Sequence, residues 1–97
     1  MTPAGRFTIG LDHPALRGHF PGRPVVPGVV LLDRIIELAA SGRRAVGLPA
    51  VKFTRPVQPG EEVAVNVTLA SADRVSFRCE VDGAEVARGT VLLEAAG

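Results

Sequence analysis

Residues 18–33 read GHFPGRPVVPGVVLLD, and this stretch decides most of what the sequence says about the fold. His19 stands among closely spaced prolines, which fix the backbone φ angle and limit the freedom of the chain. An apolar run with helical spacing follows, and it contains Asp33. Pro27 suits the first turn of a helix, and Gly42 suits the position just after its end. We therefore predict one helix between these two residues.

The predicted helix is apolar around most of its circumference. Only Asp33, Arg34 and Glu37 interrupt the run VVLLDRIIELAA, residues 29–40. A helix of this kind is normally buried on most of its sides. In a chain of 97 residues, the rest of the sequence has to wrap around it.

The rest of the sequence predicts strands that could provide this cover. Apolar residues alternate with polar or small ones, and turn signals separate the runs. Asp82-Gly83 is the strongest of these signals, because the dipeptide favours a two-residue hairpin. The expected fold is α+β: a strand, the helix, then four strands in meander-like succession, forming a curved antiparallel sheet around one central helix. The predicted strands cover residues 6–11, 50–57, 63–69, 75–81 and 85–94.

Length and composition limit the possible classes of protein. The 97 residues predict a single domain, 1–97, which buries only about two-thirds of its unfolded surface, so a second copy would help to close the core. A net charge of +1 gives no reason to expect nucleic-acid binding. The single cysteine, Cys79, excludes an internal disulfide and a multi-cysteine zinc site, and it fits a buried strand position and a reducing cytoplasm. No signal-peptide or membrane-helix segment stands out, and we expect no cofactor and no metal.

Two residues of the opening stretch could take part in proton transfer. His19 can act as a general base near neutral pH, and a stiff loop would hold it ready. The alternative is a loop histidine bonded to the backbone, and the other histidine, His13, is expected to be structural or exposed. Asp33 lies too deep in the helix to cap it, and its apolar neighbours favour the protonated form, which suits a general acid. The alternative places Asp33 at the edge of a solvated stripe with Arg34 and Glu37.

Gly28 could bind the carbonyl group of a substrate. Backbone N–H groups in the first helical turn lack partners, the helix dipole is positive there, and a glycine lets a ligand come close. This suits a developing oxyanion, whereas the alternative is a glycine needed only for a tight turn. A base, an acid and an oxyanion donor together suit removal of a proton α to a carbonyl, with loss of a β leaving group.

HFPGRPVVPGVVLLD resembles the active-site segment of the hot-dog-fold 3-hydroxyacyl-thioester dehydratases, the FabZ/FabA-like group of fatty acid synthesis. The pattern is His-Phe-Pro-x-x-Pro-Val-x-Pro-Gly followed by an apolar helix. In the family the catalytic carboxylate lies fourteen residues after the histidine, which is the spacing of His19 and Asp33. VKFTRPVQPGEEV, residues 51–63, resembles a second segment of the family, so the likeness covers most of the chain.

The resemblance implies a role for each candidate residue. His19 would take the C2 proton of a (3R)-3-hydroxyacyl thioester, Asp33 would protonate the departing C3 hydroxyl, and the Gly28 amide would bind the thioester carbonyl. It also implies a homodimer, or an oligomer built from dimers, with each site shared between two subunits. Further substrate-binding residues would be Phe20, Pro27, Val29, Leu32, Ile36 and Phe53, with core packing as the alternative role for the last three.

The sequence departs from the fatty-acid enzymes in two ways. The carboxylate is Asp, as in the FabA-like branch, where the FabZ-like branch has Glu, and this choice does not predict isomerase activity. The chain is also shorter than the usual fatty-acid enzymes. It therefore resembles more closely the short ApeI-like dehydratases of aryl polyene and pigment pathways, so the implied pathway is fatty acid or aryl polyene synthesis.

The implied partner is an acyl carrier protein that presents the acyl chain. Such carriers are acidic, and a basic rim near the site would steer them, although each cation could equally be ordinary solubilising charge. Two other functions remain open: a hot-dog thioesterase, against which His19 counts, and a non-catalytic acyl-binding subunit of a synthase. The basic residues of the first half are Arg17, Arg23, Arg43, Arg44, Lys52 and Arg55.

Overall fold

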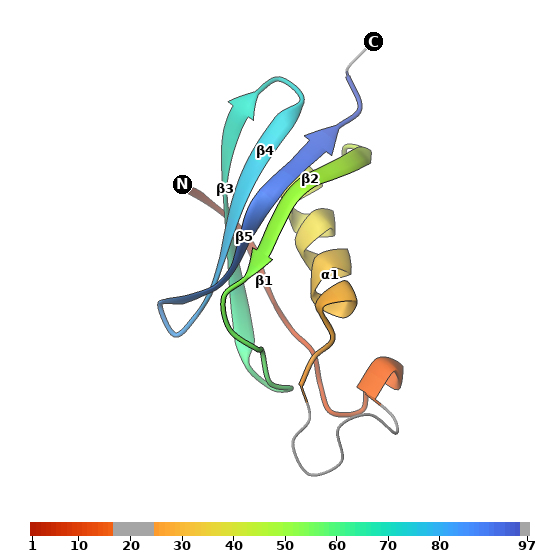
Figure 1. Ribbon diagram of the computed structural model, residues 1–97, viewed down its shortest axis with the longest axis vertical. Helices are drawn as coiled ribbons and strands as arrows, with labels where there is room; N and C mark the ends of the chain where they lie inside the picture. Colours follow the sequence, from red (N-terminus) through yellow and green to blue (C-terminus); the bar gives the residue numbers. More distant parts are fainter. Residues whose placement is uncertain (17–24, 96–97) are drawn as a thin grey trace.

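The computed structural model describes residues 1–16 and 25–95. His19 and Phe20, two of the predicted site residues, lie outside this part of the chain. Figure 1 shows a curved sheet with a helix against one of its faces. The described elements are β1 (Thr2–Thr8), a short 3-10 helix (Pro14–Leu16), α1 (Gly28–Ala40), β2 (Ala45–Phe53), β3 (Glu62–Ser71), β4 (Arg74–Val81) and β5 (Ala84–Leu93).

The sheet is antiparallel throughout, with the strand order β1-β3-β4-β5-β2. This corrects the predicted meander, because only β3, β4 and β5 are neighbours both in sequence and in the sheet. The chain crosses the sheet between β2 and β3, so that β2 pairs with β5 at one edge and β1 pairs with β3 at the other. All five strands contact α1, which lies against one face of the sheet (Figure 1).

Local sequence signals explain where the helix and one hairpin begin and end. Pro27 immediately precedes the first helical residue, with φ −57°. Ser41 and Gly42 take left-handed φ values of 50° and 85° and end the helix. A glycine just after a helix favours this left-handed conformation. Asp82 and Gly83 also have positive φ values, 51° and 81°, which is the pattern of a type I′ hairpin turn. The predicted helix and the predicted hairpin are both confirmed.

Two predicted strands are displaced toward the N-terminus. The first covers Thr2–Thr8 rather than 6–11, because its pairing with β3 extends to Thr2 opposite Val67. The second covers Ala45–Phe53 rather than 50–57, because its pairing with β5 starts at Ala45 opposite Leu93. This strand contains Pro49, whose missing N–H is tolerated on an edge strand.

The core lies between α1 and the inner face of the sheet. Ile35 of the helix and Phe77 and Cys79 of β4 are almost fully buried, at 1%, 1% and 0% exposure. The predicted burial of Cys79 is confirmed, and it raises the pKa of the thiol to about 12, which keeps the thiol protonated and unreactive. The sheet covers one side of the helix only, since Val29 on the opposite side is 73% exposed. The cover predicted around the helix is therefore incomplete among residues 1–16 and 25–95.

Candidate active site

The uncovered side of α1 forms a groove that contains Asp33. Its volume is about 430 Å³. Asp33 is exposed, while Leu32 and Ile36 beside it are half-buried. A carboxyl group is thus set among apolar side chains on an open surface, as a site for an apolar substrate requires. The groove is lined by His13, Val29, Val30, Leu32, Asp33 and Ile36.

The charged residues next to Asp33 on the helix interact with each other. Arg34 Nη1 lies 3.7 Å from Glu37 Oε2, and the guanidinium carbon of Arg34 lies 5.9 Å from the centre of the Phe7 ring. The solvated stripe that the sequence predicted therefore exists. Asp33 does not join this pair, and no described residue forms a hydrogen bond or ion pair with its carboxylate. Asp33 instead lines the groove beside this stripe.

Gly28 lies at the N-terminal end of α1, beside an aromatic ring. Pro27 accepts hydrogen bonds from the amides of Val30 and Leu31, at 3.0 and 3.3 Å, but within residues 1–16 and 25–95 nothing accepts one from the Gly28 amide. A Cβ atom at Gly28 would lie only 3.0 Å from Cε2 of Phe53, so a side chain there would press on the ring. Among the described residues this amide is thus unpaired at a helix N-terminus, where an anionic oxygen is favoured.

A second hollow, of about 360 Å³, opens next to Gly28 and Phe53. Neither residue lines the groove of Asp33, and Asp33 does not line this hollow. Helical geometry causes the separation, because five residues at 3.6 per turn place Gly28 and Asp33 about 140° apart around the axis. One chain therefore presents the predicted oxyanion donor and the predicted acid in two different hollows. Pro27 precedes Gly28 at the helix start and is half-buried.

Other predicted features have mixed outcomes. His13 lines the groove of Asp33, although the sequence indicated only a structural or exposed residue, and no neighbouring residue in the sequence predicted this position.

The predicted basic residues differ in whether they have partners. Arg55 is held by Glu61, with Nη2 to Oε2 at 3.0 Å, and Arg43 donates to the carbonyl oxygens of Ala72 and Glu94. These two cations have partners within the chain. Arg44 and Lys52 are exposed, whereas Arg17 and Arg23 lie outside the described residues.

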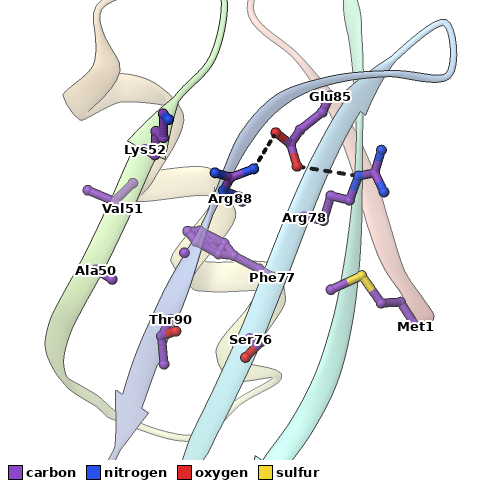
Figure 2. Close-up of a pocket in the computed structure, with 11 residues that line it drawn as sticks. Met1, Ala50, Val51, Lys52, Ser76, Phe77, Arg78, Glu85, Arg88 and Thr90 are labelled. Atoms are coloured by element: carbon purple, nitrogen blue, oxygen red, sulfur yellow. Dashed lines mark hydrogen bonds and ion pairs between the residues drawn. The ribbon is translucent and has the colours of Figure 1, made fainter.

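The face of the sheet opposite α1 carries another hollow, of about 420 Å³ (Figure 2). Arg78 and Arg88 stand on adjacent strands, and both pair with Glu85, at 3.5 Å from Nε and 3.3 Å from Nη1 respectively. Glu85 thereby offsets the repulsion of two like charges that face each other across β4 and β5. None of the predicted catalytic or substrate-binding residues that the structure describes lines this hollow.

Two searches of the described residues bear on other classes of site. Within them, no cluster of three or more His, Cys, Asp or Glu residues could hold a metal ion. No helix in the same part of the chain is long and apolar enough to span a membrane.

The model of the ApeI-like family, described as ApeI dehydratase, matches residues 2–90. The chain belongs to the ApeI-like family. Among curated relatives of this ApeI-like chain, the 3-hydroxyacyl-[acyl-carrier-protein] dehydratase FabZ of Burkholderia lata is 31% identical, over 87% of this chain and 66% of the relative. FabZ of Thermomicrobium roseum is 29% identical, over 91% of this chain and 69% of the relative. The chain thus spans about two-thirds of the length of these relatives.

Solved structures confirm the predicted hot-dog fold. The dehydratase heterocomplex ApeI:P from Xenorhabdus doucetiae superposes with a TM-score of 0.75 at 26% identity, covering 91% of this chain and 82% of that one. The (R)-hydratase from A. caviae has a TM-score of 0.70 at 20% identity, covering 94% of this chain and 91% of that one, and this likeness shows the fold alone.

Proposed function

We propose that this protein dehydrates (3R)-3-hydroxyacyl thioesters bound to an acyl carrier protein, giving trans-2-enoyl thioesters. The observation that carries the proposal is the position of Asp33, a carboxylate without a described partner in an apolar groove of an ApeI-like chain. An acid in such a groove can meet the hydroxyl group of an acyl chain while the apolar side chains bind the chain itself.

In the proposed reaction, His19 removes the C2 proton and the electrons of the broken C–H bond form the C2=C3 double bond. The C3–O bond breaks, and Asp33 gives its proton to the departing hydroxyl group, which leaves as water. The Gly28 amide donates a hydrogen bond to the thioester carbonyl, on which negative charge develops as the proton leaves. No cofactor enters this scheme, because the base and the acid account for both protons and the amide stabilises the negative charge.

We further propose that two copies of the chain build each site. The support is the separation of Gly28 and Asp33 into two hollows of one chain, which a second copy could bring together. Apolar side chains near these hollows also lack cover, with Val29 at 73% and Phe53 at 40% exposure. Phe53 ends β2, an edge strand whose free backbone groups can pair with another strand.

A mixing experiment tests the shared site. His19→Ala and Asp33→Asn subunits, each inactive alone, should regain part of the wild-type turnover once they exchange, because one of the two sites in a mixed dimer then contains both intact residues. Enoyl absorbance measures the recovery, and native mass spectrometry verifies the exchange. Mixed dimers with no more turnover than their parents would place the site within one chain.

The natural donor and setting are also part of the proposal. Arg44 and Lys52 are exposed and could attract an acidic carrier protein, whereas Arg43 and Arg55 are bound within the chain. We place the reaction in fatty acid or aryl polyene synthesis and in the cytoplasm, a compartment that suits the buried Cys79 thiol.

The test of this function offers one short 3-hydroxyacyl chain on acyl carrier protein and on coenzyme A and follows enoyl absorbance. Faster enoyl formation on the carrier protein is the expected result. Equal rates on both donors would remove the carrier preference from the proposal, and no enoyl from either donor would contradict the proposed function.

A further inference from the structure

The loop of residues 54–61, here called the staple loop, connects β2 to β3 and is bonded to three other parts of the chain. Thr54 donates its amide to the Val86 carbonyl at 2.9 Å. The Gly60 amide donates to the carbonyl of Ile9, just after β1, at 2.8 Å. The third bond runs from the Val26 amide to the Val57 carbonyl, also at 2.8 Å. The staple loop is thus bonded to β5, to the segment just after β1 and to the segment that leads into α1.

The third bond matters most for the candidate site. Val26 and Val57 are buried, at 3% and 2% exposure, and both line the hollow of Gly28. Val26 is two residues before Gly28, and only Val25 separates it in sequence from residues 17–24, which include His19. The Val57 carbonyl therefore holds the chain two residues before the predicted oxyanion donor, Gly28. A shift of the staple loop would move this point and with it the start of α1.

One ion pair closes the staple loop from within. Arg55 Nη1 and Nη2 donate to the two carboxylate oxygens of Glu61, at 3.1 and 3.0 Å, and Nη1 also donates to the Pro56 carbonyl at 2.6 Å. The same carboxylate accepts the backbone amide of Gln58 at 2.8 Å. These four bonds bracket Val57 on both sides. A guanidinium fork and a carboxylate give this arrangement a defined geometry, which a single charge on a flexible stem would not.

We propose that Arg55 and Glu61 are positioning residues of the dehydratase site, which they act on by holding the Val57 carbonyl against the Val26 amide. Neither residue touches the reacting atoms in this account. The inference rests on the proposed function for its kinetic consequences, but the contact it describes can be measured without turnover. A misplacement of about 1 Å at a reacting group can cost up to about a hundredfold in rate, so a remote pair can have a large effect.

The charge state of the pair fits this role. Hydrogen bonds from Arg55 and from the Gln58 amide lower the pKa of the Glu61 carboxyl below its ordinary value. The hydrogen bond to Glu61 in turn raises the pKa of the Arg55 guanidinium, to which the charge of Asp82 also contributes. Both partners therefore stay ionised throughout the neutral range, and the staple loop stays closed there.

The neighbouring residue, Glu62, provides a matched control. Its Oε1 pairs with Arg6 Nη1 at 2.8 Å, but both side chains are highly exposed, at 58% and 71%, and the pair joins β1 to β3 away from Val26. An exposed ion pair of this kind contributes little to the free energy of folding. Glu61→Ala and Glu62→Ala thus remove the same group one residue apart, and only the first opens the staple loop.

The experiment measures kcat, KM and amide exchange for both variants. Glu61→Ala should lower kcat about tenfold with KM changed less than about twofold, and it should speed exchange of the Val26 amide. Glu62→Ala should change none of these. The double variant Arg55→Ala/Glu61→Ala should lose no more kcat than Glu61→Ala alone, since the two residues act as one unit. If Glu61→Ala fails to fold, the isosteric Glu61→Gln replaces it.

Each outcome decides the inference. If wild type is active and Glu61→Ala keeps its kcat and its Val26 protection, the inference is overturned while the proposed function stands. Faster exchange of the Val26 amide together with an unchanged kcat would also overturn the positioning role. If wild type shows no dehydration, the proposed function fails. The exchange rate of the Val26 amide then decides alone whether Arg55 and Glu61 hold the segment that leads into α1.

Discussion

Replacing His19 by alanine should lower turnover at least about a hundredfold, the usual contribution of a general base. The substitution removes the only group in the proposed scheme that takes the C2 proton, and water in its place is a far weaker base. The variant should still fold, because the core is made by α1 and the sheet. Enoyl absorbance measures the rate, and thermal unfolding shows whether the variant is folded.

The result would contradict the proposed mechanism if the folded variant kept its turnover. His19 would then be an ordinary loop histidine bonded to backbone, which was the alternative from sequence. A loss of both turnover and folding would instead give the residue a structural role. Chemical rescue by added imidazole would support the base directly, since it restores the missing proton acceptor without restoring the side chain.

Replacing Asp33 by asparagine should remove most of the activity while the fold and the oligomer persist. Asparagine has nearly the same shape, but it cannot give a proton to the departing hydroxyl group. Asp33 is exposed, so the change leaves no buried group without a partner. The measurement is enoyl formation at saturating substrate, together with the mass of the assembly in solution.

Glu37→Gln is the matched control for this variant. Glu37 is a carboxylate one turn further along α1, it is exposed, and it pairs with Arg34 outside the groove. We expect this control to keep the wild-type rate. If Asp33→Asn were as active as Glu37→Gln, both carboxylates would belong to the solvated stripe and the groove would need another acid.

The sequence predicted those parts of the fold that depend on local signals. Helix α1 is marked by Pro27 at its start and Gly42 after its end, and the β4–β5 hairpin by Asp82-Gly83, so all of these could be found by inspection. The strand order could not, because alternation shows which face of a strand is buried and says nothing about its neighbour. The start of β2 was also predicted too late, at residue 50 instead of Ala45, because Pro49 precedes it. A proline normally indicates the end of a strand, and it is tolerated within one only at the edge of a sheet.

The candidate site shows the same division. The sequence placed Asp33 on an apolar helix and Gly28 at its first turn, and both positions are confirmed. That the two residues open into different hollows follows from helical geometry, but the hollows themselves depend on Phe53 and His13, which come from β2 and from the loop after β1. The first half of the staple loop, residues 54–57, was predicted as the end of a strand, and nothing local indicated that Arg55 would bind Glu61 and fix Val26.

The most direct test of the central claim follows enoyl absorbance and free thiol release in one sample of wild-type protein with a short 3-hydroxyacyl carrier-protein substrate, with His19→Ala alongside. The account predicts enoyl formation in the wild type, a loss of at least about a hundredfold in the variant, and no thiol release from either. Thiol release without enoyl would contradict the account and make the protein a thioesterase. Neither signal from a folded dimer would contradict it as well and favour a non-catalytic acyl-binding subunit.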